Sequence, residues 1–291
     1  NWVPIGTYTF GFSGILDGDG HTISNLTISD SESDFIGLFG VIGPGGFVFD
    51  LQITNAVVDG DTYVSICTGI NQGSIERVAT HGVIRGNMRV GGLVGYNEKT
   101  ISNSYAITSV TGNINLGGLV GFSAGTISNS YSASSIGNTS ATNRGGLVGY
   151  KTGSVSYSYY DKNVAGLDDT GKGIPLTTTQ MKSEGSYPDT WDFSNTWHIL
   201  EGETYPSLFP FSVQIEADPS QPDPASTSPI NFVATFDEPI DKSSFSADDI
   251  VLDGTAGADQ VAITEIAPNN GTTFKLAVSG MTSDGTVSVA V

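Results

Sequence analysis

The feature that most constrains the fold is a five-residue string, GGLVG, that returns three times in register. It occupies residues 91–95, 117–121 and 145–149, at spacings of 26 and then 28 residues. Degenerate copies at 65–69 and 36–40 extend the series toward the N-terminus. A fixed period of this length in sequence rich in Gly, Ser and β-branched residues predicts stacked repeats rather than a globular enzyme fold.

A second string travels with the first, as ISNSY at 101–105 and 127–131 and as VSYSY at 155–159. Apolar and polar residues alternate within it, which indicates strands with a buried and an exposed face. One such repeat cannot close a core, but repeats stacked about 4.8 Å apart bury continuous apolar columns. The sequence therefore predicts an all-β β-solenoid (β-helix) in which Leu93, Leu119 and Leu147 point inward. Cys67 occupies the same column and is expected to be a small buried hydrophobe.

The chain divides by composition into two domains. We expect the solenoid over 1–208, including a C-terminal cap at about 161–208 that contains Trp191, Trp197 and a capping box between Thr177 and Gln180. A Pro-rich connection over 209–228 precedes period-2 runs at 230–236, 261–264, 274–278 and 286–290. These runs predict a small β-sandwich over 229–291. Its final strand is expected to be absent, as in a truncated fragment.

GGLVG followed by ISNSY resembles the GLUG repeat of bacterial surface proteins, over roughly residues 1–209. The departures are Cys67, Tyr157 in the column of Asn103 and Asn129, and the degenerate first repeats. The resemblance implies an extracellular protein, secreted or at a bacterial cell surface, within long adhesin-like chains. Residues 228–232, 236–239, 252–255 and 278–281 resemble bacterial immunoglobulin-like repeats, which implies a stalk module.

The charge balance narrows the range of partners. The chain has 30 acidic and 11 basic residues and a formal net charge of −19. A protein that binds nucleic acid or an anionic membrane surface needs clustered Lys and Arg. The apolar runs are also too short to span a bilayer. We therefore expect no nucleic-acid partner and no membrane insertion in this fragment.

Catalytic signatures are weak in this sequence. His21, His81 and His198 are far apart, and neither HExxH nor GxSxG occurs. We therefore predict a non-catalytic adhesin or surface-filament (stalk) segment that mediates attachment or self-association and requires no cofactor. The alternative is a carbohydrate-active β-helix, a polysaccharide lyase or hydrolase, in which Asp17 with Asp19, or Asp59 with Asp61, supplies the carboxylates.

Two candidate binding surfaces follow from the alternation within the repeats. The serines beside the inward Ile and Val columns are expected to form one outer hydroxyl strip: Ser102, Ser104, Ser128, Ser130, Ser156 and Ser158. Its partners would be a surface glycan, a protein receptor or other copies of the chain. The columns Tyr105/Tyr131/Tyr159 and Tyr96/Phe122/Tyr150 are interpreted as stacked core ladders, with an exposed platform for sugar rings as the alternative.

The second domain holds a candidate calcium site. Asp237, Glu238, Asp248 and Asp249 lie close together in the sequence, and carboxylate oxygens are the ligands that calcium prefers. The alternative is that a soluble surface tolerates their mutual repulsion. Binding would relieve that repulsion and stiffen the domain.

Overall fold

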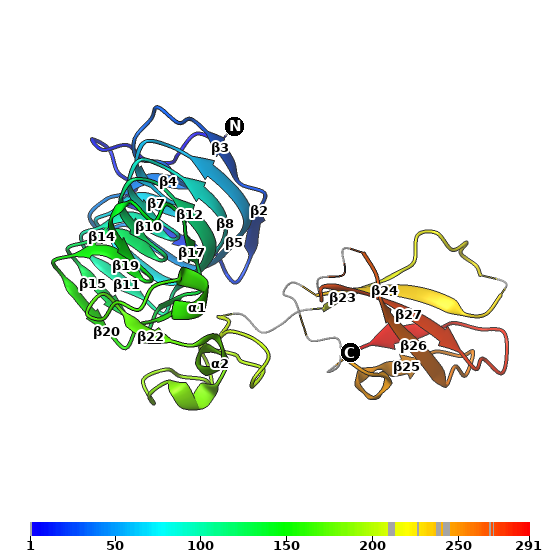
Figure 1. Cartoon of the computed structure of the whole chain (residues 1–291). Helices are drawn as coiled ribbons and strands as arrows, with labels where there is room; N and C mark the ends of the chain where they lie inside the picture. The colour runs from blue at the N-terminus through cyan, green and yellow to red at the C-terminus, as the bar shows by residue number, and fades with distance from the viewer. Residues whose placement is uncertain are drawn as a thin grey trace. The chain divides into compact units, whose positions relative to one another are not determined.

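The computed structural model describes residues 2–208, 213–225, 227–236, 240, 245–267, 269 and 271–291. The chain forms two compact units, Asn1–Phe209 and Pro210–Val291. The first is a parallel β-solenoid and the second a small region of antiparallel sheet (Figure 1). The predicted all-β fold with a solenoid of roughly 26-residue turns is therefore confirmed.

The strands of the solenoid form three parallel sheets. The largest sheet contains β1 (Ile15–Asp17), β2 (Thr22–Ser24), β3 (Thr27–Ser29), β5 (Phe47–Asp59), β8 (Ser74–Arg85), β11 (Thr100–Ser102), β12 (Tyr105–Thr111), β15 (Thr126–Ser128), β16 (Tyr131–Ser132), β17 (Ser135–Ile136), β20 (Ser154–Ser156), β21 (Tyr159–Asp161) and β22 (Ile174–Leu176). The second contains β4 (Phe39–Ile42), β7 (Thr68–Asn71), β10 (Val94–Asn97), β14 (Val120–Ser123) and β19 (Val148–Lys151). The third contains β6 (Thr62–Val64), β9 (Met88–Gly91), β13 (Ile114–Gly117) and β18 (Thr142–Gly145).

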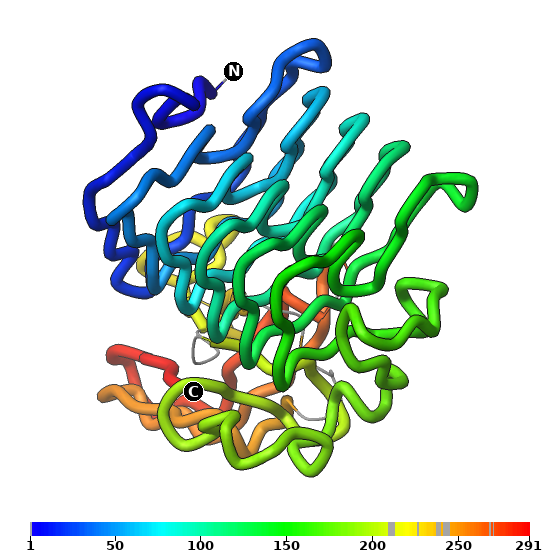
Figure 2. The backbone as a smooth tube through the Cα atoms, turned by 90° about the vertical axis from the view of Figure 1, so that its left-hand side faces the viewer, coloured from blue at the N-terminus to red at the C-terminus, as the bar shows by residue number. Residues whose placement is uncertain are grey.

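Successive turns stack in the register that the repeat predicts (Figure 2). Val94 pairs with Val120, and Val120 pairs with Val148. Leu93, Leu119 and Leu147 all point into the core and are fully buried. Cys67 is buried in the same core, as expected. Equivalent residues therefore form continuous columns along the solenoid.

The outer glycines of GGLVG allow two sheets to meet backbone to backbone. A Cβ added to Gly121 in β14 would lie 2.5 Å from the carbonyl carbon of Arg89 and 2.6 Å from the amide nitrogen of Val90 in β9. The middle glycine instead leaves room for a side chain, because a Cβ on Gly146 would lie 2.0 Å from the ring of Tyr160. Within each GGLVG motif, the outer glycines thus allow close packing of neighbouring strands, and the leucine points into the core.

The segment after β21 covers both the end and the side of the solenoid. Helix α1 (Lys162–Ala165) and strand β22, which pairs with β21, cover the last turn. Helix α2 (Thr178–Met181) starts with the predicted capping box between Thr177 and Gln180, and the 3₁₀ helix η1 (Glu184–Ser186) follows it. Residues 177–208, here called the strap, then pack along the outer side of the turns. Only the first part of the expected C-terminal cap therefore covers the end of the solenoid, and the strap covers its side.

The second unit has two antiparallel sheets. The first has the order β23 (Val213–Ala217), β24 (Ile230–Phe236), β27 (Thr273–Ser279) and β26 (Gln260–Glu265), and the other pairs β25 (Val251–Asp253) with β28 (Ser288–Ala290). The 3₁₀ helix η2 (Ala247–Asp249) precedes β25. Strand β23 lies inside the stretch expected as a Pro-rich connection and pairs with β24. The immunoglobulin-like identity of this unit stays a prediction.

Candidate functional site

The outer face of β11, β15 and β20 carries two parallel columns of hydroxyl groups. One column contains Thr100, Thr126 and Ser154, and the other contains Ser102, Ser128 and Ser156, each paired with its equivalent on the next turn. Between them Ile101 and Ile127 are buried in the core, and Val155 packs against it. The six hydroxyl-bearing residues are exposed or half-buried. We call this uncharged surface the hydroxyl face.

The prediction that all six serines line one outer face is wrong for Ser104, Ser130 and Ser158. All three are fully buried. The hydroxyl of Ser104 donates to Ser102 O at 2.8 Å and accepts from Val78 N at 3.1 Å, and the Ser130 hydroxyl accepts from Ser104 N at 3.1 Å. Their structural role is thus to satisfy backbone groups between neighbouring turns.

A residue with left-handed backbone conformation explains why Ser104, Ser130 and Ser158 face inward. Asn103, Asn129 and Tyr157 have φ of 46°, 45° and 47°. A residue in this conformation bends the chain sharply and interrupts the alternation of an extended strand. Ser104 therefore faces the interior although it stands two residues after the outward Ser102. Thr100 and its equivalents take the outward place, because they lie on the same strand as Ser102.

The outward columns continue past the hydroxyl face into charged and aromatic residues. Ser102 pairs with Glu76, Glu76 with Phe49, and Phe49 with Asp17. The neighbouring column runs from Thr100 through Ser74 and Phe47 to Ile15. Phe47 and Phe49 stack with ring centroids 4.6 Å apart. The hydroxyl face is therefore flanked at one end by a carboxylate and two aromatic rings.

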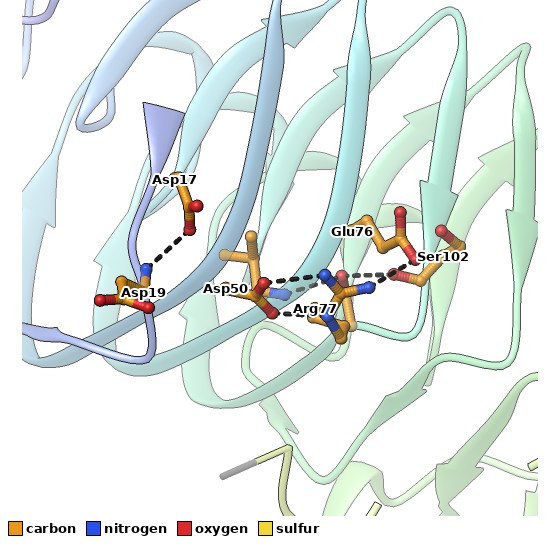
Figure 3. Close-up of polar contacts among 8 residues, drawn as sticks. Asp17, Asp19, Asp50, Glu76, Arg77 and Ser102 are labelled. Carbon is orange, nitrogen blue, oxygen red and sulfur yellow. Dashed lines mark hydrogen bonds and ion pairs between the residues drawn. The ribbon is translucent and has the colours of Figure 1, made fainter. Parts of the chain in front are cut away.

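Arg77 fixes the charges at this end of the face. Its guanidinium contacts Asp50 at 2.5 Å and Glu76 at 2.7 Å (Figure 3). The hydrogen bond to Asp50 raises the pKa of Arg77 above its ordinary value. The guanidinium also lies 5.9 Å from the centroid of the Phe49 ring. The Glu76 side chain is therefore held in place beside the hydroxyls.

Tyr105, Tyr131 and Tyr159 form a buried ladder, but on the outside of the solenoid wall. They pack with Trp191, Trp197, Met181 and Leu208 in a cluster separate from the main core. The strap is held there by hydrogen bonds from Tyr131 Oη to Pro206 O at 2.6 Å and from Trp191 Nε1 to Tyr157 O at 2.9 Å. The strap thus covers this column, which is not an open platform for sugars.

The second aromatic column, Tyr96/Phe122/Tyr150, is adjoined by a further series of rings that the sequence did not predict. Tyr96 and Phe122 stack at 4.8 Å with nearly parallel planes, and Phe122 contacts Tyr150 at 5.3 Å. Tyr8, Phe35 and Tyr63 form a neighbouring series, because Tyr96 pairs in register with Ile70 and Tyr63 lies in β6 of another sheet. Arg89 joins the two series, with its guanidinium 4.7 Å from the Tyr63 centroid and 5.4 Å from those of Tyr96 and Phe122. The column is therefore a ladder, but its predicted core position is wrong, because Tyr96 and Phe122 are half-buried, Tyr150 is exposed and none belongs to an apolar core.

The neighbouring series could have been found from the positions of its residues in the repeat. Tyr63 and Arg89 each stand two residues before the first residue of a GGLVG-type string, and both have positive φ. An arginine in an aromatic column conceals the series unless cation–π packing is considered.

The predicted acidic sites are only partly described. Asp237 and Glu238 lie outside the described residues. Ser246 caps η2: its hydroxyl accepts from Asp248 N, and Asp249 completes the capping box by accepting from Ser246 N at 2.8 Å. In the described parts of the chain, no three His, Cys, Asp or Glu residues gather as a metal site. Calcium binding stays a prediction.

The acid pairs proposed for catalysis have local structural contacts. Asp17 Oδ1 accepts from Asp19 N at 2.8 Å within a turn. Asp59 forms an ion pair with Arg85 at 3.2 Å.

Among the described residues no helix is long and apolar enough to cross a bilayer.

Comparison with known proteins agrees with this geometry. The model of the GLUG motif matches residues 86–111, which contain β9 to β12 and so form one turn. Halomucin of Haloquadratum walsbyi is 44% identical over 69 residues, or 24% of this chain and 1% of halomucin. A protein of Evansella cellulosilytica named "Putative Gly-rich membrane protein" is 37% identical over 81 residues, or 27% of this chain and 9% of that protein. The chain thus spans a small fraction of either relative. No solved structure matches the chain significantly.

Proposed function

We propose that this chain is a non-catalytic extracellular segment, an adhesin or surface-filament module that mediates attachment or self-association. The observation that carries the proposal is the hydroxyl face. It offers regularly spaced donors and acceptors on a flat, rigid sheet, and short side chains lose little conformational entropy when they are covered.

The charge of the whole chain makes this face distinctive. With a net charge of −19, like-charge repulsion disfavours association over most of the surface. Three turns of Thr and Ser form an uncharged area on which that repulsion is weakest. The partners are a surface glycan, a protein receptor or other copies of the chain, with no role for nucleic acid or membrane insertion.

The comparisons support an extracellular setting. One relative is named as a membrane protein, and the matched motif is the one whose bacterial examples led us to expect a surface location. We place the chain at a cell surface or in the secreted fraction, with the second unit as an immunoglobulin-like stalk.

The test places charge on the hydroxyl face. Thr126→Lys combined with Ser128→Lys should abolish adhesion to cells or self-association measured by sedimentation, while the melting temperature is retained. Thr111→Lys combined with Ser135→Lys is the matched control, because both residues are exposed on other strands of the same sheet. Undiminished association by the first variant would refute a role for this face.

A carbohydrate-active β-helix is the second candidate. One observation favours it: Asp17 and Glu76 occupy the same outward column, on either side of Phe49. Incubation with neutral and acidic polysaccharides separates the two functions. Reproducible chain cleavage that is lost in Glu76→Gln would replace the non-catalytic proposal.

A further inference from the structure

A groove of about 560 Å³ opens along the end of the hydroxyl face. It crosses three turns, because its lining includes Gly46 and Phe47, then Gly73 and Ser74, then Lys99 and Thr100. Gly46 and Gly73 are neighbouring corner residues that let the turns stack closely, because a Cβ on Gly73 would meet Gly46 O and the side chain of Ile42. The groove therefore runs along the stacking direction of the solenoid.

The lining combines an apolar surface with many hydrogen-bonding groups. Phe47 contributes an aromatic ring that is half-buried and stacked on Phe49. The polar groups are the hydroxyls of Ser74, Thr100 and Ser102 and the side chains of Gln72, Glu76 and Lys99. Gln72 is oriented by its hydrogen bond to Glu98 at 3.2 Å, and Glu76 by its contact with Arg77. Several of these groups are thus already held in place without a ligand.

We infer that this groove binds a neutral polysaccharide chain. A sugar ring has an apolar C–H face suited to an aromatic ring and a rim of hydroxyls that pair with Ser, Thr, Gln and carboxylate groups. A groove that crosses three turns and is open to solvent suits an extended polymer better than a small ligand. This inference rests on the proposed attachment function and specifies its ligand.

The charge of the groove selects against polyanions. The lining holds one carboxylate, Glu76, and one ammonium, Lys99, so it has no excess of positive charge. The chain as a whole repels anions at a net charge of −19. Neutral polysaccharides should therefore bind in preference to acidic ones.

The test is affinity gel electrophoresis of the full chain in gels containing mannan, laminarin or galactomannan, with alginate as the acidic comparison. We expect retardation by at least one neutral polysaccharide and none by alginate. Phe47→Ala should weaken that binding at least tenfold, and Thr100→Val should weaken it measurably with little change in volume. Tyr150→Ala is the control, because it removes an exposed aromatic residue from β19, in another sheet.

Three results would overturn the inference. They are no retardation by any neutral polysaccharide, equal retardation by alginate, or unweakened binding by a folded Phe47→Ala variant. If Phe47→Ala lowers the melting temperature, Thr100→Val decides the outcome in its place. A chain that still attaches through Thr126 and Ser128 but binds none of these polysaccharides would retain the proposed function and lose this inference.

Discussion

At the scale of single residues, one backbone conformation decides which side chains face outward. Asp50, Arg77, Asn103, Asn129 and Tyr157 have φ between 45° and 53°. Asn and Asp tolerate this region, whereas Arg and Tyr adopt it at a cost. Local contacts offset that cost at both exceptions. Arg77 is paired with Asp50, and the carbonyl of Tyr157 accepts from the Trp191 indole.

Cys67 should be inert in the folded protein. Its side chain is fully buried, and burial raises the pKa of the thiol to about 12. The thiolate is the reactive species, so native protein at pH 8 should not be alkylated by iodoacetamide, whereas protein unfolded in urea should react fully. Mass spectrometry after timed quenching measures both rates. Native alkylation as fast as that of a small free thiol would contradict the buried position.

His81 should make stability depend on pH. Burial beside Tyr105 lowers the pKa of His81 to about 4, below the ordinary value of about 6.5. The unfolded chain therefore takes up the proton first, so this contribution to stability is complete above about pH 6.5 and is lost as the pH falls toward 4.

His81→Gln should accordingly show a shallower fall in the free energy of unfolding over this range than the parent protein does. Urea unfolding at several pH values measures the difference. His21→Gln serves as the control because His21 is exposed. Parallel pH profiles for His81→Gln and the parent would show that His81 titrates normally.

At the scale of elements, the close approach of β9 and β14 depends on glycine. Gly121→Ala should lower the free energy of unfolding by about 1–3 kcal/mol or more, because the added methyl group meets backbone rather than a movable side chain. Gly185→Ala is the matched control, since its nearest neighbour, Ser183 Oγ, is 3.9 Å from the added Cβ. Chemical denaturation of both variants gives the comparison, and equal stability would mean that the two strands can separate freely.

Local sequence was sufficient to predict some elements but not others. The repeat spacing predicted the leucine columns, and the Thr177–Gln180 capping box predicted α2. Both features depend on residues that are close together in the sequence or in the repeat. The alternation failed at Ser104, because Asn103 turns the chain after Ser102. The strap position was not predictable, since it depends on contacts such as Tyr131 with Pro206, 75 residues apart. The groove was missed for the same reason, as its lining comes from three turns.

At the scale of the whole molecule, each unit has its own apolar core. Leu119 belongs to the main core of the solenoid and Leu276 to the core of the second unit. Separate cores predict separate cooperative unfolding. Each leucine-to-alanine variant should therefore destabilise only its own unit, by about 2–5 kcal/mol.

The tryptophans provide the measurement. All three, Trp2, Trp191 and Trp197, belong to the first unit, so their fluorescence reports on the solenoid. Leu119→Ala should shift the fluorescence-detected melting curve, whereas Leu276→Ala should shift only the second calorimetric transition. A fluorescence shift of the same size in both variants would indicate that the units unfold together.

The strap gives the solenoid a mechanical property. Tension that arrives through residues 210–291 enters the first unit next to Leu208, at the end of the strap. The strap contacts Tyr105, Tyr131 and Tyr159, which belong to three different turns. We expect such a load to act as shear on several turns at once rather than to peel away the last turn alone. Contact with three turns should therefore raise the force at which the first unit yields when it is pulled from its C-terminal side.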